Sequence, residues 1–201
     1  MEEYDWLWCP NEIEFGPSHT VHDPEFGKQP HGYRSPNWVF RLSLPPQDLD
    51  NRRKIESFLA RTEGTAIVNV YDPRTEMPKH FETSGVVPSL TVTAMDRAAR
   101  TLTVTGAAGD IITEGDPMSF IVGGVKYYFR AMQDLVLSGA AQSLEVYIRP
   151  RLTQTFSVFA NRIKPTCRFV IGNINQTGGS TNTDKVSEFE LSGVEYWHPV
   201  T

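Results

Sequence analysis

The sequence predicts a mainly β protein that has one helix and contains a small antiparallel β-barrel. Three observations support this fold class. The segment Trp38–Leu44 alternates strictly between large apolar side chains and other residues. From Val86 onward, short β-rich segments follow one another with turn residues between them. Only Asp48–Arg61 has apolar residues at helical spacing.

The first expected strand covers Trp38–Leu44. Trp38, Phe40, Leu42 and Leu44 recur every second residue, so one face of this strand is buried. We expect Pro45-Pro46 to end it, because proline has no amide to donate to a strand ladder.

The expected helix lies near residues 48–61. Asp48 or Asp50 can cap its first amides. Leu49, Ile55, Phe58 and Leu59 fall on one stripe, while Arg52, Arg53 and Lys54 face outward. A second strand, Ala66–Tyr71, should follow and stop at Asp72-Pro73, which gives a strand, helix, strand order.

Short strands then dominate the chain. They are expected at Ser89–Ala94, Arg100–Thr105, Met118–Val122, Val125–Met132, Ser143–Ile148, Thr155–Phe159, Cys167–Ile171 and Val186–Trp197. Strands spaced about 8–12 residues apart with turn residues between them are typical of a small antiparallel barrel or sandwich.

Composition excludes several classes of protein. Nineteen basic against 24 acidic residues give a net charge of −5, which argues against a sequence-independent nucleic-acid surface. Cys9 and Cys167 are too few for a disulfide framework. We find no signal peptide and no apolar run near the ~20 residues of a membrane helix, so a soluble protein without membrane anchoring is expected.

Gly123-Gly124 is the first motif that could carry chemistry. A dinucleotide fingerprint needs G-x-G-x-x-G between a strand and a helix, and a phosphate loop needs G-x-x-x-x-G-K-S/T. Neither spacing is present, and the segment after the glycines, Val125–Arg130, is expected to form a strand. The sequence therefore predicts a two-residue β-hairpin turn.

Other candidate sites are weaker. His19, His22, Asp23 and His31 are clustered in sequence, but without helical H-E-x-x-H spacing or cysteine ligands they indicate surface or interface histidines. No G-x-S-x-G elbow is present. Asp110 with Glu114 and Asp116 could form an acid pair for glycoside hydrolysis, but nothing in the sequence fixes their separation, and Glu114-Gly-Asp116 is expected in a turn before a strand. We therefore expect no catalytic residues, no metal and no cofactor.

Aromatic residues admit two interpretations. They can stack on sugars, or they can be buried in a core or subunit interface, where Trp and Tyr are enriched. The second interpretation is favoured, since the aromatic residues on strands alternate with other side chains. These residues are Trp6, Trp8, Tyr33, Trp38, Tyr127, Tyr128, Tyr196 and Trp197.

The order of four segments resembles a known family. They are "WVFRLSLPPQDLDNRRKIESFLARTEG" (38–64), "VYDPRTEMP" (70–78), "GDIITEGDPMSFIVGGVKYYFRAMQD…LEVYIRPRL" (109–152) and "CRFVIGN…EFELSGVEYW" (167–197). In this order they resemble the distal tail proteins of long-tailed bacteriophages and tail-tip proteins built like them.

This resemblance implies a structural virion protein of the tail tip, not an enzyme, synthesised in the host cytoplasm. It implies a ring, commonly a hexamer, that joins the tail tube protein to the tail-tip hub proteins or baseplate, while DNA only passes through the channel. It also implies a tail-tube-like β domain with an inserted barrel. We assign residues 1–85 and 160–201 to the ring-forming domain and 86–159 to the barrel.

Two sets of residues follow from these hypotheses. Aromatic residues dominate many subunit interfaces, so the ring contacts are expected at Trp6, Trp8, Phe15, Tyr33, Trp38 and Phe40. The alternative function is a carbohydrate-binding module of the tail tip that contacts a host surface glycan through Tyr127 or Tyr128. These two neighbours on a strand point to opposite faces, so one is expected in the core.

Overall fold

The computed structural model describes residues 12–18, 21–22, 31–32, 37–47, 50, 53–54, 57, 67–82, 86–171 and 187–196. These residues are mainly in β-strands. The chain divides into two compact units. The first takes Met1–Ser18, Trp38–Val70 and Arg168–Tyr196, and the second takes His19–Asn37, Tyr71–Cys167 and Trp197–Thr201. In this division the long continuous piece of the second unit is Tyr71–Cys167.

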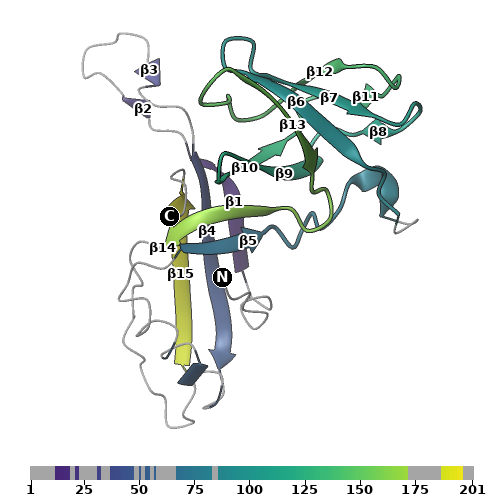
Figure 1. Ribbon diagram of the computed structural model, residues 1–201. Coiled ribbons are helices and arrows are strands. Elements are labelled where there is room, and N and C mark those ends of the chain that lie inside the picture. The colour runs from purple at the N-terminus through teal and green to yellow at the C-terminus, as the bar shows by residue number, and fades with distance from the viewer. Residues whose placement is uncertain are drawn as a thin grey trace. The chain divides into compact units, whose positions relative to one another are not determined.

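The first unit is built on one five-stranded sheet with the order β1-β4-β15-β14-β5. β1 is Glu12–Ser18, β4 is Asn37–Gln47 and β5 is Ile67–Tyr71, whereas β14, Thr166–Ile171, and β15, Ser187–Glu195, come from the far end of the chain. The long strands β4 and β15 run antiparallel side by side (Figure 1). Strands from before and after the second unit thus complete a single sheet.

β4 confirms the expected alternation. Trp38, Phe40 and Leu42 are buried, while Arg41 between them is exposed. The strand does not end at the prolines, however, but continues to Gln47. Leu44 pairs with Phe189 and Gln47 pairs with Ser187, so Pro45 and Pro46 together lie opposite a single residue of β15. A bulge of this kind accommodates residues that cannot donate to the ladder.

The second unit contains a four-stranded sheet with the order β12-β7-β6-β13, which comprises Gln142–Glu145, Thr101–Gly106, Leu90–Asp96 and Gln154–Ala160. Two short pairs accompany it: β9 (Pro117–Val122) with β10 (Val125–Arg130), and β8 (Ile111–Ile112) with β11 (Leu135–Val136). All of these pairs are antiparallel, and Figure 1 shows them as the teal and green strands.

The expected closed barrel is not found among the described strands. The hairpin β9–β10 joins the four-stranded sheet only through single bridges, Ser119 to Asn161 on one side and Ala131 to Val146 on the other. Because one bridge on each side does not form a continuous ladder, the sheets enclose a core without closing into a barrel. That core is an apolar cluster built from both sheets, with Leu90, Leu102, Phe120 and Phe129 among its members.

The two glycines form the expected hairpin turn. Val122 pairs directly with Val125, which leaves Gly123 and Gly124 as the two-residue connection. Their φ angles are 57° and 79°. Positive φ at both positions is what a type I′ turn requires, and glycine adopts it without the steric cost that other residues bear.

Short elements complete the described chain. Asp50, Arg53, Lys54 and Ser57 are helical and exposed, in the region of the expected helix, and the rest of that region lies outside the described residues. β2 (Val21–His22) pairs with β3 (His31–Gly32), and a 3-10 turn, η2, covers Lys79–Phe81. In these described parts, no helix has the length and apolar content that crossing a membrane requires.

Candidate functional site

A connected polar site of the second unit begins at the turn after β5. Pro73 follows Asp72, and the Thr75 amide donates to the Asp72 carbonyl at 3.0 Å. Proline suits the second position of such a turn because its φ is already fixed. The Asp72 side chain reinforces the turn, since its Oδ1 accepts the Arg74 amide at 3.0 Å.

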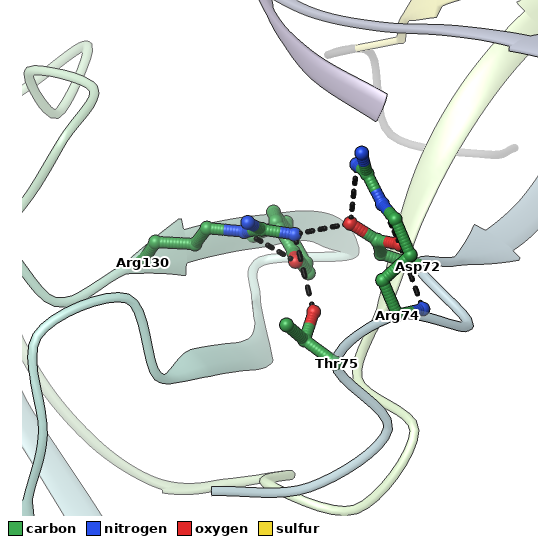
Figure 2. Close-up of polar contacts among 5 residues, drawn as sticks. Asp72, Arg74, Thr75 and Arg130 are labelled. Atoms are coloured by element: carbon green, nitrogen blue, oxygen red, sulfur yellow. Dashed lines mark hydrogen bonds and ion pairs between the residues drawn. The ribbon is translucent and has the colours of Figure 1, made fainter. Parts of the chain in front are cut away.

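The Asp72 carboxylate lies between two guanidinium groups (Figure 2). Arg74 approaches from the same turn, with Nε 2.9 Å from Oδ1 and Nη2 2.8 Å from Oδ2. Arg130 approaches from β10, with Nη2 2.5 Å from Oδ2. The Asp72 side chain is buried. Paired, forked contacts of this kind are the stronger class of hydrogen bonds in proteins.

Arg130 is oriented by two further contacts. Its Nε donates to the Tyr128 hydroxyl at 3.2 Å, and its Nη2 donates to Thr75 Oγ1 at 3.2 Å. Tyr128 and Arg130 are two positions apart on β10, so their side chains leave the strand on the same face. The face of the hairpin that points away from the apolar cluster therefore carries the partners of the Asp72 turn.

Electrostatics keeps Asp72 ionised. Burial alone raises the pKa of its carboxyl, but the hydrogen bonds from Arg74 and the charge of Arg130 outweigh burial and hold that pKa below the ordinary value of 3.8. Burial also raises the pKa of the Tyr128 hydroxyl, which keeps it protonated. Both oxygens of Asp72 are occupied by donors. This arrangement suits a structural ion pair and not a proton-transfer group, whose pKa is tuned toward the working pH.

The residues expected at subunit contacts have different positions. Phe15, Trp38 and Phe40 are buried within the first unit, with Trp38 only 1% exposed. Phe15 packs on Trp38, and both Phe15 and Phe40 pack edge-on against Phe169. Their burial argues against the expected subunit contacts at these three positions, because side chains inside the core of one chain are not free to contact a neighbour. Trp6, Trp8 and Tyr33 lie outside the described residues.

The residues expected to touch a glycan are also buried. Tyr127 is 4% exposed and belongs to the apolar cluster, where its ring lies beside those of Phe120 and Phe129. Tyr128 is 1% exposed and faces Arg130. Stacking on a sugar needs an open ring face, and neither tyrosine offers one. Their burial therefore argues against the expected glycan contact at these positions.

Asp110, just before β8, and Asp116, just before β9, have structural partners. Arg162 Nη1 lies 2.8 Å from Asp110 Oδ2, and both side chains are buried. The Arg162 guanidinium also donates to the carbonyls of Pro88 and Ile111. Asp116 is buried and accepts two amides, those of Lys79 and Thr113, each at 2.9 Å.

No metal site emerges from the residues that the structure describes, which contain no group of three His, Cys, Asp or Glu suited to an ion. His22 and His31 are backbone partners of the pair β2–β3. His19, Asp23, His198 and Cys9 lie outside the described part of the chain. Cys167 is buried.

The network around Asp72 could be predicted only in part. The Asp-Pro step indicated the end of a strand, and alternation placed Tyr127 and Tyr128 on opposite faces of β10. No local signal joins Asp72 to Arg130, because 58 positions separate them. The sequence matches no protein-family model and no curated protein.

Proposed function

We propose that this chain is a structural component of a bacteriophage tail tip, where copies assemble into a ring that joins the tail tube to the tip around the DNA channel. The proposal starts from the resemblance of four ordered segments to distal tail proteins. It assigns the chain a structural role, in which the chain holds other tail proteins in position and catalyses no reaction.

The discontinuous sheet of the first unit is the observation that carries the proposal. β4 and β5 precede most of the second unit, β14 and β15 follow it, and all four lie in one sheet. The resemblance implies this layout, a tube-like β domain interrupted by a second β domain. Its first segment contains β4 except Asn37, its last segment contains β15, and its "VYDPRTEMP" segment contains the Asp72 turn.

Sheet edges are the surfaces through which we infer that the ring closes. In the described sheet, β1 and β5 are the edge strands. Edge strands are templates for pairing with another chain unless something covers them. A cyclic ring repeats one heterologous interface, in which two different surfaces of each copy meet. Two different edges of one sheet supply such a pair of surfaces, and the aromatic residues Trp6, Trp8 and Tyr33 are proposed to assist.

The charge of the chain agrees with a channel that lets DNA pass. Binding to the phosphate backbone depends on clustered Lys and Arg, and each contact to a phosphate adds affinity. With 19 basic against 24 acidic residues, the chain has a net charge of −5. A ring with this balance is expected not to retain DNA by its overall charge.

The mass of the purified protein in solution tests the proposal. Light scattering coupled to size-exclusion chromatography should give a closed oligomer, with a mass near six times that of the chain if the resemblance holds, and negative-stain images should show rings. A chain without residues 1–11 should form fewer rings if the aromatic segment assists. Phe159→Ser, at an exposed position of the second unit, is the control expected to assemble normally.

Two results together would contradict the proposed ring. A protein that stays monomeric over a wide range of concentration, and that is absent from phage particles when these are imaged, would exclude the ring. Binding to a glycan array without oligomerisation would favour the alternative carbohydrate-binding function, although through residues other than the buried Tyr127 and Tyr128.

A further inference from the structure

We propose that residues 72–82 form a polar strap that opens from the second unit as a separate step while the apolar core of that unit stays folded. The strap runs from the Asp72 turn through the 3-10 turn η2. It is held at three anchors, whose partners lie on β10, in the connection between β13 and β14, and just before β9. This inference does not depend on the proposed ring.

The first anchor is the Asp72 turn itself. Arg130 on β10 holds two strap residues, Asp72 through Oδ2 at 2.5 Å and Thr75 through Oγ1 at 3.2 Å. Within the strap, Arg74 adds its own contacts to Asp72. A single guanidinium group of β10 thus fixes the start of the strap (Figure 2).

The second anchor lies in the middle of the strap. The Lys164 amide donates to the Glu76 carbonyl at 2.5 Å, and Lys164 Nζ lies 3.7 Å from Glu76 Oε2. The same ammonium group lies 5.2 Å from the centre of the Tyr71 ring. Lys164 belongs to the connection between β13 and β14. Both charged side chains are partly exposed, so this anchor relies mainly on the backbone hydrogen bond.

The third anchor fixes the end of the strap. Asp116 Oδ1 accepts the Lys79 amide at 2.9 Å, while Asp116 Oδ2 accepts the Thr113 amide beside it. The Arg162 guanidinium lies 5.5 Å from the centre of the Phe81 ring. Asp116 stands just before β9 and Arg162 just after β13.

The apolar core does not include the strap. The described members of the core cluster, and the apolar side chains that pack against it, all lie between Leu90 and Ala160. Pro78 is the buried apolar residue of the strap, which is otherwise held by hydrogen bonds and charged groups, and its release removes no member of that cluster. Segments with few apolar contacts open locally at a smaller free-energy cost than the core. This difference is the reason to expect two separate steps.

The pH should shift the equilibrium between closed and open strap through Asp116. Its pKa is raised above 3.8, chiefly by burial, although the two amides and the charge of Arg162 act to lower it, and Asp134 acts to raise it. Opening removes the Lys79 amide from Oδ1, which by itself raises the pKa, but it also lets water reach the carboxylate, and because burial is the larger effect the pKa should return toward 3.8. The closed strap therefore binds the proton more tightly than the open strap, and protonation of Asp116 favours closure.

Asp72 acts in the opposite direction at lower pH. Its pKa in the closed strap lies below 3.8, so its ionised form stabilises closure and this contribution is lost as the pH falls through that lowered value. Closure should therefore strengthen as the pH falls from neutral toward 3.8, and weaken below 3.8. As the pH falls, Asp116 at the end of the strap takes up its proton first, and Asp72 at the start of the strap follows at lower pH.

Hydrogen exchange of the full chain tests the strap, with rates corrected for the intrinsic effect of pH. At neutral pH, the amides of residues 75–82 should exchange at least about tenfold faster than those of β6 and β7, as expected for a local opening. From neutral pH toward 3.8, strap protection should rise, by about tenfold for each unit by which the closed pKa of Asp116 exceeds the open one. The protection of the core amides should not rise over the same pH range.

Two variants complete the experiment. Asp116→Asn cannot take up the proton, so its strap protection should stay constant over that range. Glu82→Gln, an exposed position at the strap end, should behave like the parent. The proposal is overturned if strap and core amides are equally protected. It is also overturned if strap protection in the parent stays flat or falls between neutral pH and 3.8, or if the rise in strap protection persists in Asp116→Asn. If Asp116→Asn does not fold, the parent series alone decides.

Discussion

Arg130 Nη2 lies 2.5 Å from Asp72 Oδ2, although 58 positions separate the two residues. The contact joins β10 to the turn that follows β5, and the Asp72 side chain in it is buried. Removing one partner of a buried ion pair leaves the other charge desolvated without compensation, which is why such changes cost more than the pair itself contributes. The relationship leads to two predictions.

Asp72→Asn should lower the free energy of unfolding by about 2–3 kcal/mol. This cost lies at the low end for a broken buried ion pair, because the Arg130 side chain is 17% exposed. Urea denaturation measures the change. Arg74→Ala is the matched control: its side chain is 53% exposed, so its loss should cost less than about 1 kcal/mol. Equal effects of the two changes would mean that Arg130 contributes little.

The same pair should make stability depend on pH in a defined direction. The Asp72 pKa is lowered in the folded state, so its stabilising contribution is present above the ordinary value of 3.8 and is lost as the pH falls through the lower folded value. The difference in stability between the parent and Asp72→Asn should therefore be full at pH 7 and shrink below pH 3.8. A difference that grows in acid would contradict this assignment.

Local patterns predicted much of the fold because burial on one side leaves a period of two in the sequence. The alternation around Trp38, Phe40 and Leu42 placed β4 correctly, and Gly123-Gly124 placed the hairpin. The prolines were misread because the bulge that accommodates them depends on β15, whose pairing with β4 is not encoded locally. The closed barrel was wrong for a similar reason, since closure depends on pairing between distant strands.

The candidate sites show the same limit. Alternation put Tyr127 and Tyr128 on opposite faces of β10, as the structure has them, but it suggested that only one of the two is buried. The outer face is covered because Arg130 and the distant Asp72 turn form a polar network there. Trp38 was assigned to an interface because composition does not distinguish a core aromatic from one that contacts a neighbour.

Gly193 is required by a close approach between strands. A Cβ at this position would lie 2.5 Å from Phe40 Cε1 and 2.9 Å from the Val170 carbonyl oxygen, and the backbone oxygen cannot move aside cheaply. Gly193→Ala should therefore lower the free energy of unfolding by about 1–3 kcal/mol through overpacking. Gly16→Ala, where no atom lies within 4 Å, should change stability by less than about 0.5 kcal/mol. Thermal denaturation of both variants provides the comparison, and a neutral Gly193→Ala would argue against the Phe40 contact.

The hairpin turn offers a test of backbone strain without a change in packing. Gly123 has φ 57°, and a Cβ added to it would meet no atom within 4 Å, so only its backbone conformation opposes substitution. Gly123→Ala should cost about 1 kcal/mol, whereas Gly123→Asn should cost less because asparagine tolerates the left-handed region. Hydrogen exchange of the β9 and β10 amides measures the difference. Equal losses in both variants would indicate that the turn is not of type I′.

Arg162 and Asp110 form the most deeply buried ion pair among the described residues, with side chains 2% and 1% exposed. Arg162→Met should lower the free energy of unfolding by about 3–5 kcal/mol, because it strands the Asp110 carboxylate in the interior. Asp110 Oδ1 already has no hydrogen-bond partner among the described residues, and Arg162→Met also removes the guanidinium from Oδ2.

The double variant Arg162→Met with Asp110→Leu separates the two causes. If the stranded charge dominates, the double variant should recover most of the loss, because an apolar pair no longer needs compensation. If the contacts of Arg162 with the Pro88 and Ile111 carbonyls dominate, the double variant should be no more stable than Arg162→Met. Lys164→Met, which breaks a half-exposed pair with Glu76, should cost less than about 1 kcal/mol and controls for the loss of a cation near the strap. A double-mutant cycle from urea denaturation gives the coupling energy between Arg162 and Asp110 directly.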